Sequence, residues 1–140
     1  MTDSQVEILL IEDSMDDAEL TIRALKKRNL ANRLLHINDG EKALEYLFNP
    51  NNNHFPKIIL LDLKMPKVDG IQILKQLKND PAKKVIPVVV LTSSKEERDI
   101  VETYNLGVNA YIVKPVQFDK FMEAVDQLGM FWLLLNQPPK

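Results

Sequence analysis

The stretch KIILLDLKMPKVDG, residues 57–70, decides the fold of this chain. Its apolar run Ile58–Leu61 leads directly into Asp62, and Pro66 and Gly70 then break the chain. A short unbroken apolar run that is bounded by turn residues is typical of a strand buried on both faces, as in a parallel sheet. Asp62 is therefore predicted at the carboxyl end of a central strand, which is the edge where open α/β sheets bind ligands.

Runs of the same kind predict four more strands, and segments with apolar residues at helical spacing alternate with them. The predicted strands are Val6–Ile11, Leu34–Ile37, Lys57–Asp62, Pro87–Leu91 and Ala110–Val113. The predicted helices cover residues 14–28, 41–48, 70–77, 96–104 and 117–135. This alternation predicts a single three-layer α/β domain over residues 1–140, with a parallel five-stranded sheet and helices on both faces.

The composition excludes several classes of protein. The chain has 140 residues, about one domain, and it has no cysteine, which excludes disulfides and thiolate metal sites. Its net charge of −2 argues against a domain whose main role is to bind nucleic acid directly. No apolar run approaches the roughly 20 residues of a membrane helix, and the start MTDSQVEI does not resemble a secretion signal. We therefore expect a cytoplasmic protein that does not contact membranes.

Polar side chains stand at the ends of the predicted strands. Glu12 and Asp13 follow the first strand, Asp62 ends the third, Thr92 follows the fourth and Lys114 follows the fifth. The carboxyl ends of parallel strands lie at one edge of the sheet, so these side chains are expected to converge. Three carboxylates alone would repel one another, and oxygen ligands without sulfur favour a hard cation, Mg²⁺.

With Mg²⁺ and Lys114 added to the three acids, the predicted pocket is formally neutral and ready for an anion. A carboxylate, a magnesium ion, a lysine and a hydroxyl are the groups that phosphoryl transfer to an aspartate requires. The residues therefore predict that Asp62 accepts a phosphoryl group.

This set of residues resembles the receiver domains of two-component response regulators. The matching positions are the acidic pair Glu12-Asp13, the phospho-acceptor Asp62, the switch hydroxyl Thr92, the switch aromatic Tyr111 and the pair Lys114-Pro115, which conventionally has a cis peptide bond. The resemblance covers about residues 6–128, with the last helix and tail at about 117–140. It implies the flavodoxin-like (βα)5 fold of that family, with the strand order 2-1-3-4-5.

The resemblance also implies roles for these residues. Asp13 binds Mg²⁺ directly, Glu12 does so mostly through water, and Lys64 offers its backbone carbonyl. Thr92 and Lys114 hold the phosphoryl group on Asp62.

The resemblance further implies a conformational switch and positions that set the lifetime of the phosphoryl group. Thr92, Tyr111 and Pro115 belong to a switch on the face formed by the fourth helix, the fifth strand and the fifth helix. In the family, the positions of Lys64 and Ser94 tune the lifetime of the phosphoryl group. The alternatives are a solvated Lys64 and a Tyr111 that is simply half-buried in its strand.

A finer resemblance concerns the partner. The segments LKNDPAKKVIPVVVLTSS, NPNNNHFP and FWLLLNQPP are similar to the stand-alone regulators of cyanobacterial and bacterial phytochromes, and no effector domain follows residue 140. The implied protein is a phosphorelay component that a sensor histidine kinase, a phytochrome, phosphorylates. It is a substrate of the kinase rather than an enzyme that turns over, although it assists its own phosphorylation and dephosphorylation.

The apolar ending GMFWLLL predicts a homodimer. Its six consecutive apolar residues exceed one face of an amphipathic helix, so Met130, Leu133 and Leu134 point away from the core. We expect these three residues to form a dimer contact along the fifth helix and the tail. The alternative is that the tail folds back over its own core.

Three other functions fit the sequence less well. A haloacid-dehalogenase-like phosphatase normally has a second acid two residues after the nucleophile, where this chain has Lys64. A flavodoxin-like FMN binder needs a phosphate loop after the first strand, but the acids of residues 12–17 would repel phosphate. A degenerate receiver would lack one of the key residues, and all are present. His36 and His54 have no partner motif, and we assign them no catalytic role.

Overall fold

The computed structural model describes residues 6–26, 33–52, 54–93 and 110–127. Five strands form one fully parallel sheet of order β2-β1-β3-β4-β5. The strands are β1 (Ile8–Ile11), β2 (Leu34–Ile37), β3 (Ile58–Asp62), β4 (Val88–Thr92) and β5 (Ala110–Val113). The predicted fold class and strand order are therefore confirmed.

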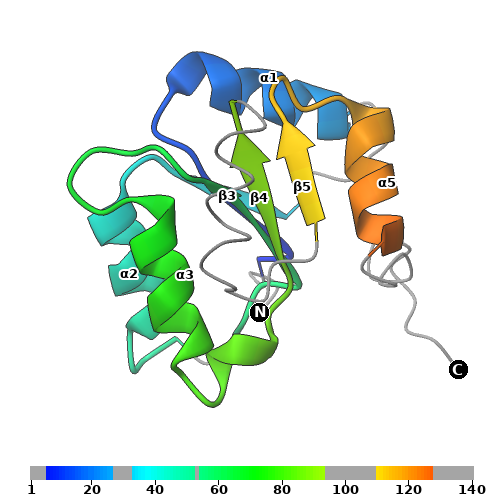
Figure 1. Cartoon of the computed structure of the whole chain (residues 1–140). Helices are drawn as coiled ribbons and strands as arrows, with labels where there is room; N and C mark the ends of the chain where they lie inside the picture. The colour runs from blue at the N-terminus through cyan, green and yellow to red at the C-terminus, as the bar shows by residue number, and fades with distance from the viewer. Residues whose placement is uncertain (1–5, 27–32, 53, 94–109, 128–140) are drawn as a thin grey trace, which may run out of the picture.

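Helices cover both faces of the sheet (Figure 1). The described helices are α1 (Met15–Lys26), α2 (Gly40–Phe48), α3 (Gly70–Lys78), α5 (Phe118–Gln127) and the short 3-10 helix η1 (Lys83–Val85). In Figure 1, α2 and α3 lie together on one face, and α1 and α5 lie on the other. The helix expected at residues 96–104 and the expected continuation of α5 to residue 135 lie outside the described residues.

The central strands are apolar on both sides because each side packs against a helical layer. Along β1, Ile8 and Leu10 join the core beneath α1 and α5, whereas Leu9 and Ile11 join the core beneath α2 and α3. All residues of β1, β3 and β4 are buried. Burial on both faces is the physical reason why unbroken apolar runs predict these strands.

Strand boundaries and one helix differ in detail from the prediction. β1 begins at Ile8 rather than Val6, and β4 covers Val88–Thr92 rather than starting at Pro87. Proline lacks the N–H that a strand ladder uses, although the carbonyl of Pro87 accepts a bond from the Ile59 N–H at 2.9 Å. The helix η1 was not predicted. Asp80 Oδ1 accepts the backbone N–H groups of Ala82 and Lys83, at 2.9 and 3.0 Å, just where this helix begins.

A close backbone approach fixes the loop between β3 and α3. A Cβ atom on Gly70 would lie 2.5 Å from the carbonyl oxygen of Asp62, so only glycine allows α3 to begin here. The Gly70 N–H donates to the Leu63 carbonyl at 2.9 Å, and Asp69 and Gln72 form a capping box at the start of the helix. The first turn of α3 therefore rests directly on the backbone of Asp62.

Candidate functional site

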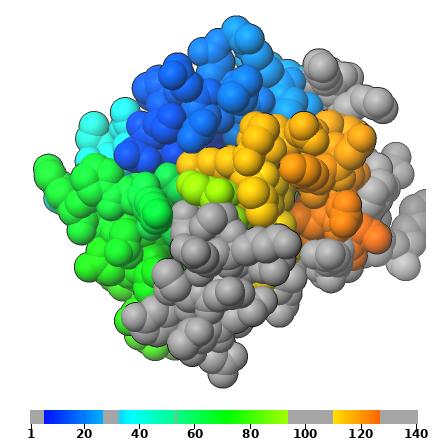
Figure 2. Space-filling model, turned by 45° about the horizontal axis from the view of Figure 1, so that its top comes forward, coloured from blue at the N-terminus to red at the C-terminus, as the bar shows by residue number. Residues whose placement is uncertain are grey.

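The strand ends bring the predicted site residues to one edge of the sheet. Glu12 follows β1, Asp62 ends β3, Thr92 ends β4 and Lys114 follows β5. The backbone N–H of Lys114 donates to the carbonyl of Thr92 at 2.8 Å, and this hydrogen bond fixes the ends of β4 and β5 relative to each other. Figure 2, turned so that this end comes forward, shows the N-terminal segment (blue), the end of β4 (yellow-green) and the β5–α5 region (gold) side by side.

Three carboxylates gather at this edge, as the sequence predicts. Glu12, Asp13 and Asp62 each have an oxygen within 4.8 Å of the other two. Glu12 is 0% and Asp62 2% exposed, whereas Asp13 is half-buried. Burial, followed by the hydrogen bond and the charge of Glu12, raises the pKa of Asp62 to about 8. The three carboxylates therefore repel one another when ionised, and a bound cation would reduce this repulsion.

Lys114 supplies one positive charge to this cluster. Its Nζ lies 2.9 Å from Glu12 Oε1 and 3.3 Å from Asp62 Oδ1. The expected contact between Lys114 and Asp62 is thus present, and Glu12 is nearer still. Burial alone lowers the pKa of the Lys114 ammonium, but the surrounding carboxylates outweigh burial and hold the pKa above its usual value.

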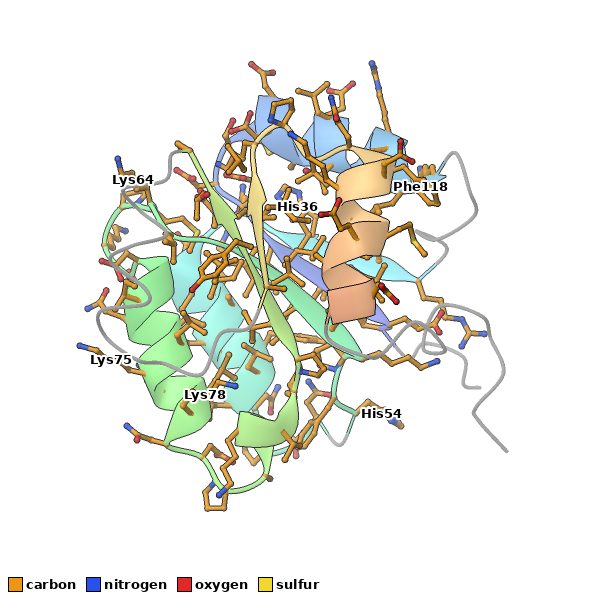
Figure 3. All side chains as sticks on the ribbon, turned by 45° about the vertical axis from the view of Figure 1, so that its right-hand side comes forward. His36, His54, Lys64, Lys75, Lys78 and Phe118 are labelled. Carbon is orange, nitrogen blue, oxygen red and sulfur yellow. The ribbon has the colours of Figure 1, made fainter. Side chains whose placement is uncertain are left out.

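The other predicted ligands and helpers lie around Asp62. The backbone N–H of Lys64 donates to Asp62 Oδ1 at 3.3 Å, and Figure 3 shows the Lys64 side chain at this end of the molecule, directed outward. Thr92 is fully buried, and its Oγ1 has no hydrogen-bond partner among the described residues. A buried hydroxyl is seldom left unpaired, so Thr92 Oγ1 is available to a group that enters the site.

The arrangement fits a divalent cation with oxygen ligands. Glu12, Asp13 and Asp62 offer only carboxylate oxygens, and their like charges cannot be neutralised by Lys114 alone. Glu12 Oε2 accepts the Ser14 N–H at 3.2 Å, whereas Oε1 has no hydrogen-bond partner among the described residues and lies 2.9 Å from the Lys114 ammonium. The three carboxylates together could therefore hold Mg²⁺.

The structure places the predicted switch residues as follows. Tyr111 is half-buried in β5 and packs against the core beneath α2 and α3. The Lys114–Pro115 peptide bond is cis. Ser94, predicted to tune the phosphoryl lifetime, and Met130, Leu133 and Leu134, predicted to form a dimer contact, lie outside the described residues.

Asp17 belongs to the site, although the sequence places it only as an acid in the first turn of a helix. Its Oδ2 lies 3.2 Å from Lys114 Nζ. Ser14 caps the start of α1, because its Oγ accepts the Asp17 N–H at 3.2 Å. A Glu or Gln at this third helical position often accepts the N–H of the cap residue, but this position holds Asp17, and Glu12 accepts the Ser14 N–H. The carboxylate of Asp17 therefore turns to Lys114.

His36 also contacts this region, through the backbone. Its Nε2 lies 2.8 Å from the carbonyl oxygen of Glu12. This bond ties β2 to the segment that follows β1, which is a structural role. His54 lies at the opposite end of the molecule from Lys64 (Figure 3).

Comparisons with known proteins agree with this geometry. The family model of the response regulator receiver domain matches residues 8–126. Response regulator Rcp1 of Synechocystis is 39% identical over 129 residues, which cover 90% of this chain and 88% of Rcp1. The bacteriophytochrome response regulator AtBRR is 48% identical with a TM-score of 0.85, and the match covers 96% of this chain and 100% of AtBRR.

Two further solved structures record states of related proteins. The Mn²⁺-bound form of Rcp1 has a TM-score of 0.71 at 37% identity, with 96% of this chain and 99% of that one covered. The phosphorylated cyanobacterial phytochrome response regulator RcpA has a TM-score of 0.73 at 37% identity, with 97% and 99% covered.

Within the part of the chain that the structure describes, no helix is long and apolar enough to cross a membrane. Receiver domains act in phosphorelay signalling, take phosphoryl groups from histidine kinases and bind Mg²⁺ or Mn²⁺ in an acidic pocket. Because the family match spans β1 to α5 and the acidic cluster lies at the carboxyl edge of the sheet, this chain belongs to the response regulator receiver domain family.

Proposed function

We propose that this protein is a stand-alone response regulator, with one receiver domain over residues 1–140, that accepts a phosphoryl group on Asp62 from a histidine kinase. One observation carries the proposal. The Asp62 carboxylate is 2% exposed and lies between two acids and the ammonium of Lys114, 3.3 Å from its Oδ1. A structural acid at a strand end has no need of such surroundings.

The chemistry of the step follows from these contacts. A carboxylate oxygen of Asp62 attacks phosphorus, the O–P bond forms, and the bond from phosphorus to the imidazole nitrogen of the kinase breaks. Mg²⁺, when bound, neutralises charge on the phosphoryl oxygens. We assign it to Asp13, Asp62 and the Lys64 backbone carbonyl, with Glu12 acting through water. Without a metal, burial and Glu12 raise the pKa of Asp62, and a bound cation would favour the ionised carboxylate that attacks.

Lys114 and Thr92 then hold the product. The ammonium of Lys114 pairs with the phosphoryl group, and the unpaired Thr92 Oγ1 donates a hydrogen bond to a phosphoryl oxygen. Movement of Thr92 toward the site opens space for the ring of Tyr111 to turn inward. This movement changes the face that contains β5 and α5. Pro115, which lies between these two elements, is part of the same switch.

The protein is a switch rather than an enzyme that turns over. Its own residues assist the Mg²⁺-dependent phosphorylation of Asp62 and the slower hydrolysis of the phosphoryl group. Lys64 and Ser94 tune the rate of that hydrolysis, with the exposed side chain of Lys64 shielding the group from water.

A bacterial phytochrome is the proposed kinase, because the 48% identity with AtBRR covers nearly all of both chains. The test is transfer of radiolabelled phosphoryl from an autophosphorylated bacteriophytochrome kinase, with Asp62→Asn as the control. We expect label on the wild type within minutes and none on the variant. Label that remains on the kinase, under conditions in which acetyl phosphate modifies Asp62, would exclude this partner but not the receiver chemistry.

A homodimer through the end of the fifth helix and the tail is the second part of the proposal. It is supported by the sequence, where Met130, Leu133 and Leu134 are apolar at positions that a lone helix would expose. Light scattering of the full chain is expected to give twice the monomer mass. A chain that ends at Gln127 is expected to be monomeric, and a dimer of that shortened chain would contradict the proposed contact.

A further inference from the structure

Lys114 contacts a third carboxylate that the phosphorylation chemistry does not use. Asp17, on α1, places Oδ2 3.2 Å from Lys114 Nζ, compared with 2.9 Å for Glu12 Oε1 and 3.3 Å for Asp62 Oδ1. The Lys114 side chain is only 15% exposed, whereas that of Asp17 is 39% exposed. One ammonium therefore bridges β1, β3 and α1, with Asp17 on the solvent side.

The position of Asp17 is fixed by its backbone. Its N–H donates to Ser14 Oγ at 3.2 Å, and its carbonyl accepts the hydroxyl of Thr21 at 3.0 Å. Thr21 is 2% exposed, so this second bond is held by the core. The first turn of α1 is therefore anchored on both sides, and from this turn the carboxylate of Asp17 contacts Lys114. Its neighbour Asp16 is exposed.

We propose that Asp17 is a positioning residue that holds Lys114 toward α1 and competes for its ammonium with the phosphoryl group on Asp62. The inference rests on the proposed function, since Lys114 is the group that pairs with the phosphoryl oxygens. Before phosphorylation, Asp17 keeps the ammonium in place beside Asp62. After phosphorylation, it retains part of the charge that the phosphoryl group needs, and its own negative charge disfavours a second anion nearby.

The consequence is that Asp17 weakens the phosphorylated state and shortens its lifetime. Asp17→Asn keeps the shape and one oxygen but removes the charge. We expect this variant, at fixed Mg²⁺, to bind beryllofluoride about two- to five-fold more tightly than the wild type, which is the range for a partly exposed ion pair. Phosphorylated Asp17→Asn should lose its phosphoryl group more slowly by a similar factor. Both differences should shrink as salt is added, because the pair is partly solvated.

Asp16→Asn is the matched control. It removes the same charge from the same helical turn, but Asp16 does not contact Lys114. We expect Asp16→Asn to behave as the wild type does, and Asp17→Glu, which keeps the charge, to restore wild-type behaviour. Equal effects of the two asparagine variants, no effect of Asp17→Asn, or weaker binding of beryllofluoride by Asp17→Asn would each overturn the competition.

A second measurement, made without metal or phosphoryl group, separates this inference from the proposed function. The ¹⁵N-labelled ammonium signal of Lys114, assigned with Lys114→Arg, should shift in Asp17→Asn and stay in place in Asp16→Asn. An unchanged signal in Asp17→Asn would refute the hold on Lys114, whatever the chemistry at Asp62. A wild type that binds no beryllofluoride would instead refute the proposed function and, with it, the competition.

Discussion

Replacing Asp62 by asparagine should stabilise the metal-free protein, and more so as the pH rises. Asp62 is 2% exposed beside the fully buried Glu12, and its pKa is raised from 3.8 to about 8, first by burial and then by Glu12. A group whose pKa is higher in the folded than in the unfolded state contributes stability that is fully present below the unfolded pKa. That stability is lost as the pH rises through the folded pKa, so the window here runs from 3.8 to about 8.

The size of the effect follows from this window. Each pKa unit corresponds to about 1.4 kcal/mol, so the full shift from 3.8 to about 8 sets an upper limit of about 6 kcal/mol above pH 8. Asparagine has nearly the same shape and no charge, but it leaves Lys114 with one partner fewer. We therefore expect Asp62→Asn to raise the free energy of unfolding by about 2–4 kcal/mol at pH 8 and by little at pH 4.

Urea unfolding followed by far-ultraviolet circular dichroism, in EDTA, measures this difference at pH 4, 6 and 8. The comparison of variant with wild type removes the contributions of titrating groups that do not interact with Asp62. Adding Mg²⁺ should then stabilise the wild type, by about 2.7 kcal/mol at 100 times its dissociation constant, and should affect the variant less. A difference that does not change with pH, or a variant that is less stable than the wild type at pH 8, would refute the reasoning.

Three further predictions concern the surroundings of the site. Gly70→Ala places a Cβ 2.5 Å from the carbonyl oxygen of Asp62, so it should cost about 1–3 kcal/mol in urea unfolding and slow labelling of Asp62 by acetyl phosphate; full stability and full labelling would contradict the close approach. Lys64→Ala should speed dephosphorylation, measured by loss of radiolabel over time, and an unchanged rate would remove its shielding role. Lys83→Met removes a cation that lies 4.6 Å from the ring of Phe48, so it should cost about 0.5–1 kcal/mol and leave phosphorylation unchanged; slower phosphorylation would show that this end of the fold is coupled to the site.

The sequence predicts the sheet well because the sheet is buried on both faces. Ile58–Leu61 contains no polar residue, and such a run is typical of a strand that is buried on both faces of a parallel sheet. The convergence of Asp62, Thr92 and Lys114 follows in turn, since the carboxyl ends of parallel strands share one edge. Both features follow from the alternation of apolar strands and helices along the chain, which can be recognised in the sequence alone.

Contacts that depend on side-chain choice are harder to predict. Whether Asp17 caps its own helix or turns to Lys114 depends on which carboxylate takes the Ser14 N–H, and only the folded arrangement decides that. The close approach of Gly70 to Asp62 is of the same kind, because a glycine next to a predicted helix start is also a common turn residue. The helix η1 is three residues long and leaves no periodic signal.

Intact mass spectrometry after incubation with acetyl phosphate and Mg²⁺ tests most directly whether Asp62 is the phospho-acceptor. Asp62→Asn and a sample in EDTA serve as controls, and a second receiver domain shows that the conditions are active. The account predicts one added phosphoryl group on the wild type and none in either control. An adduct on Asp62→Asn, or no adduct on the wild type together with no binding of beryllofluoride, would contradict it.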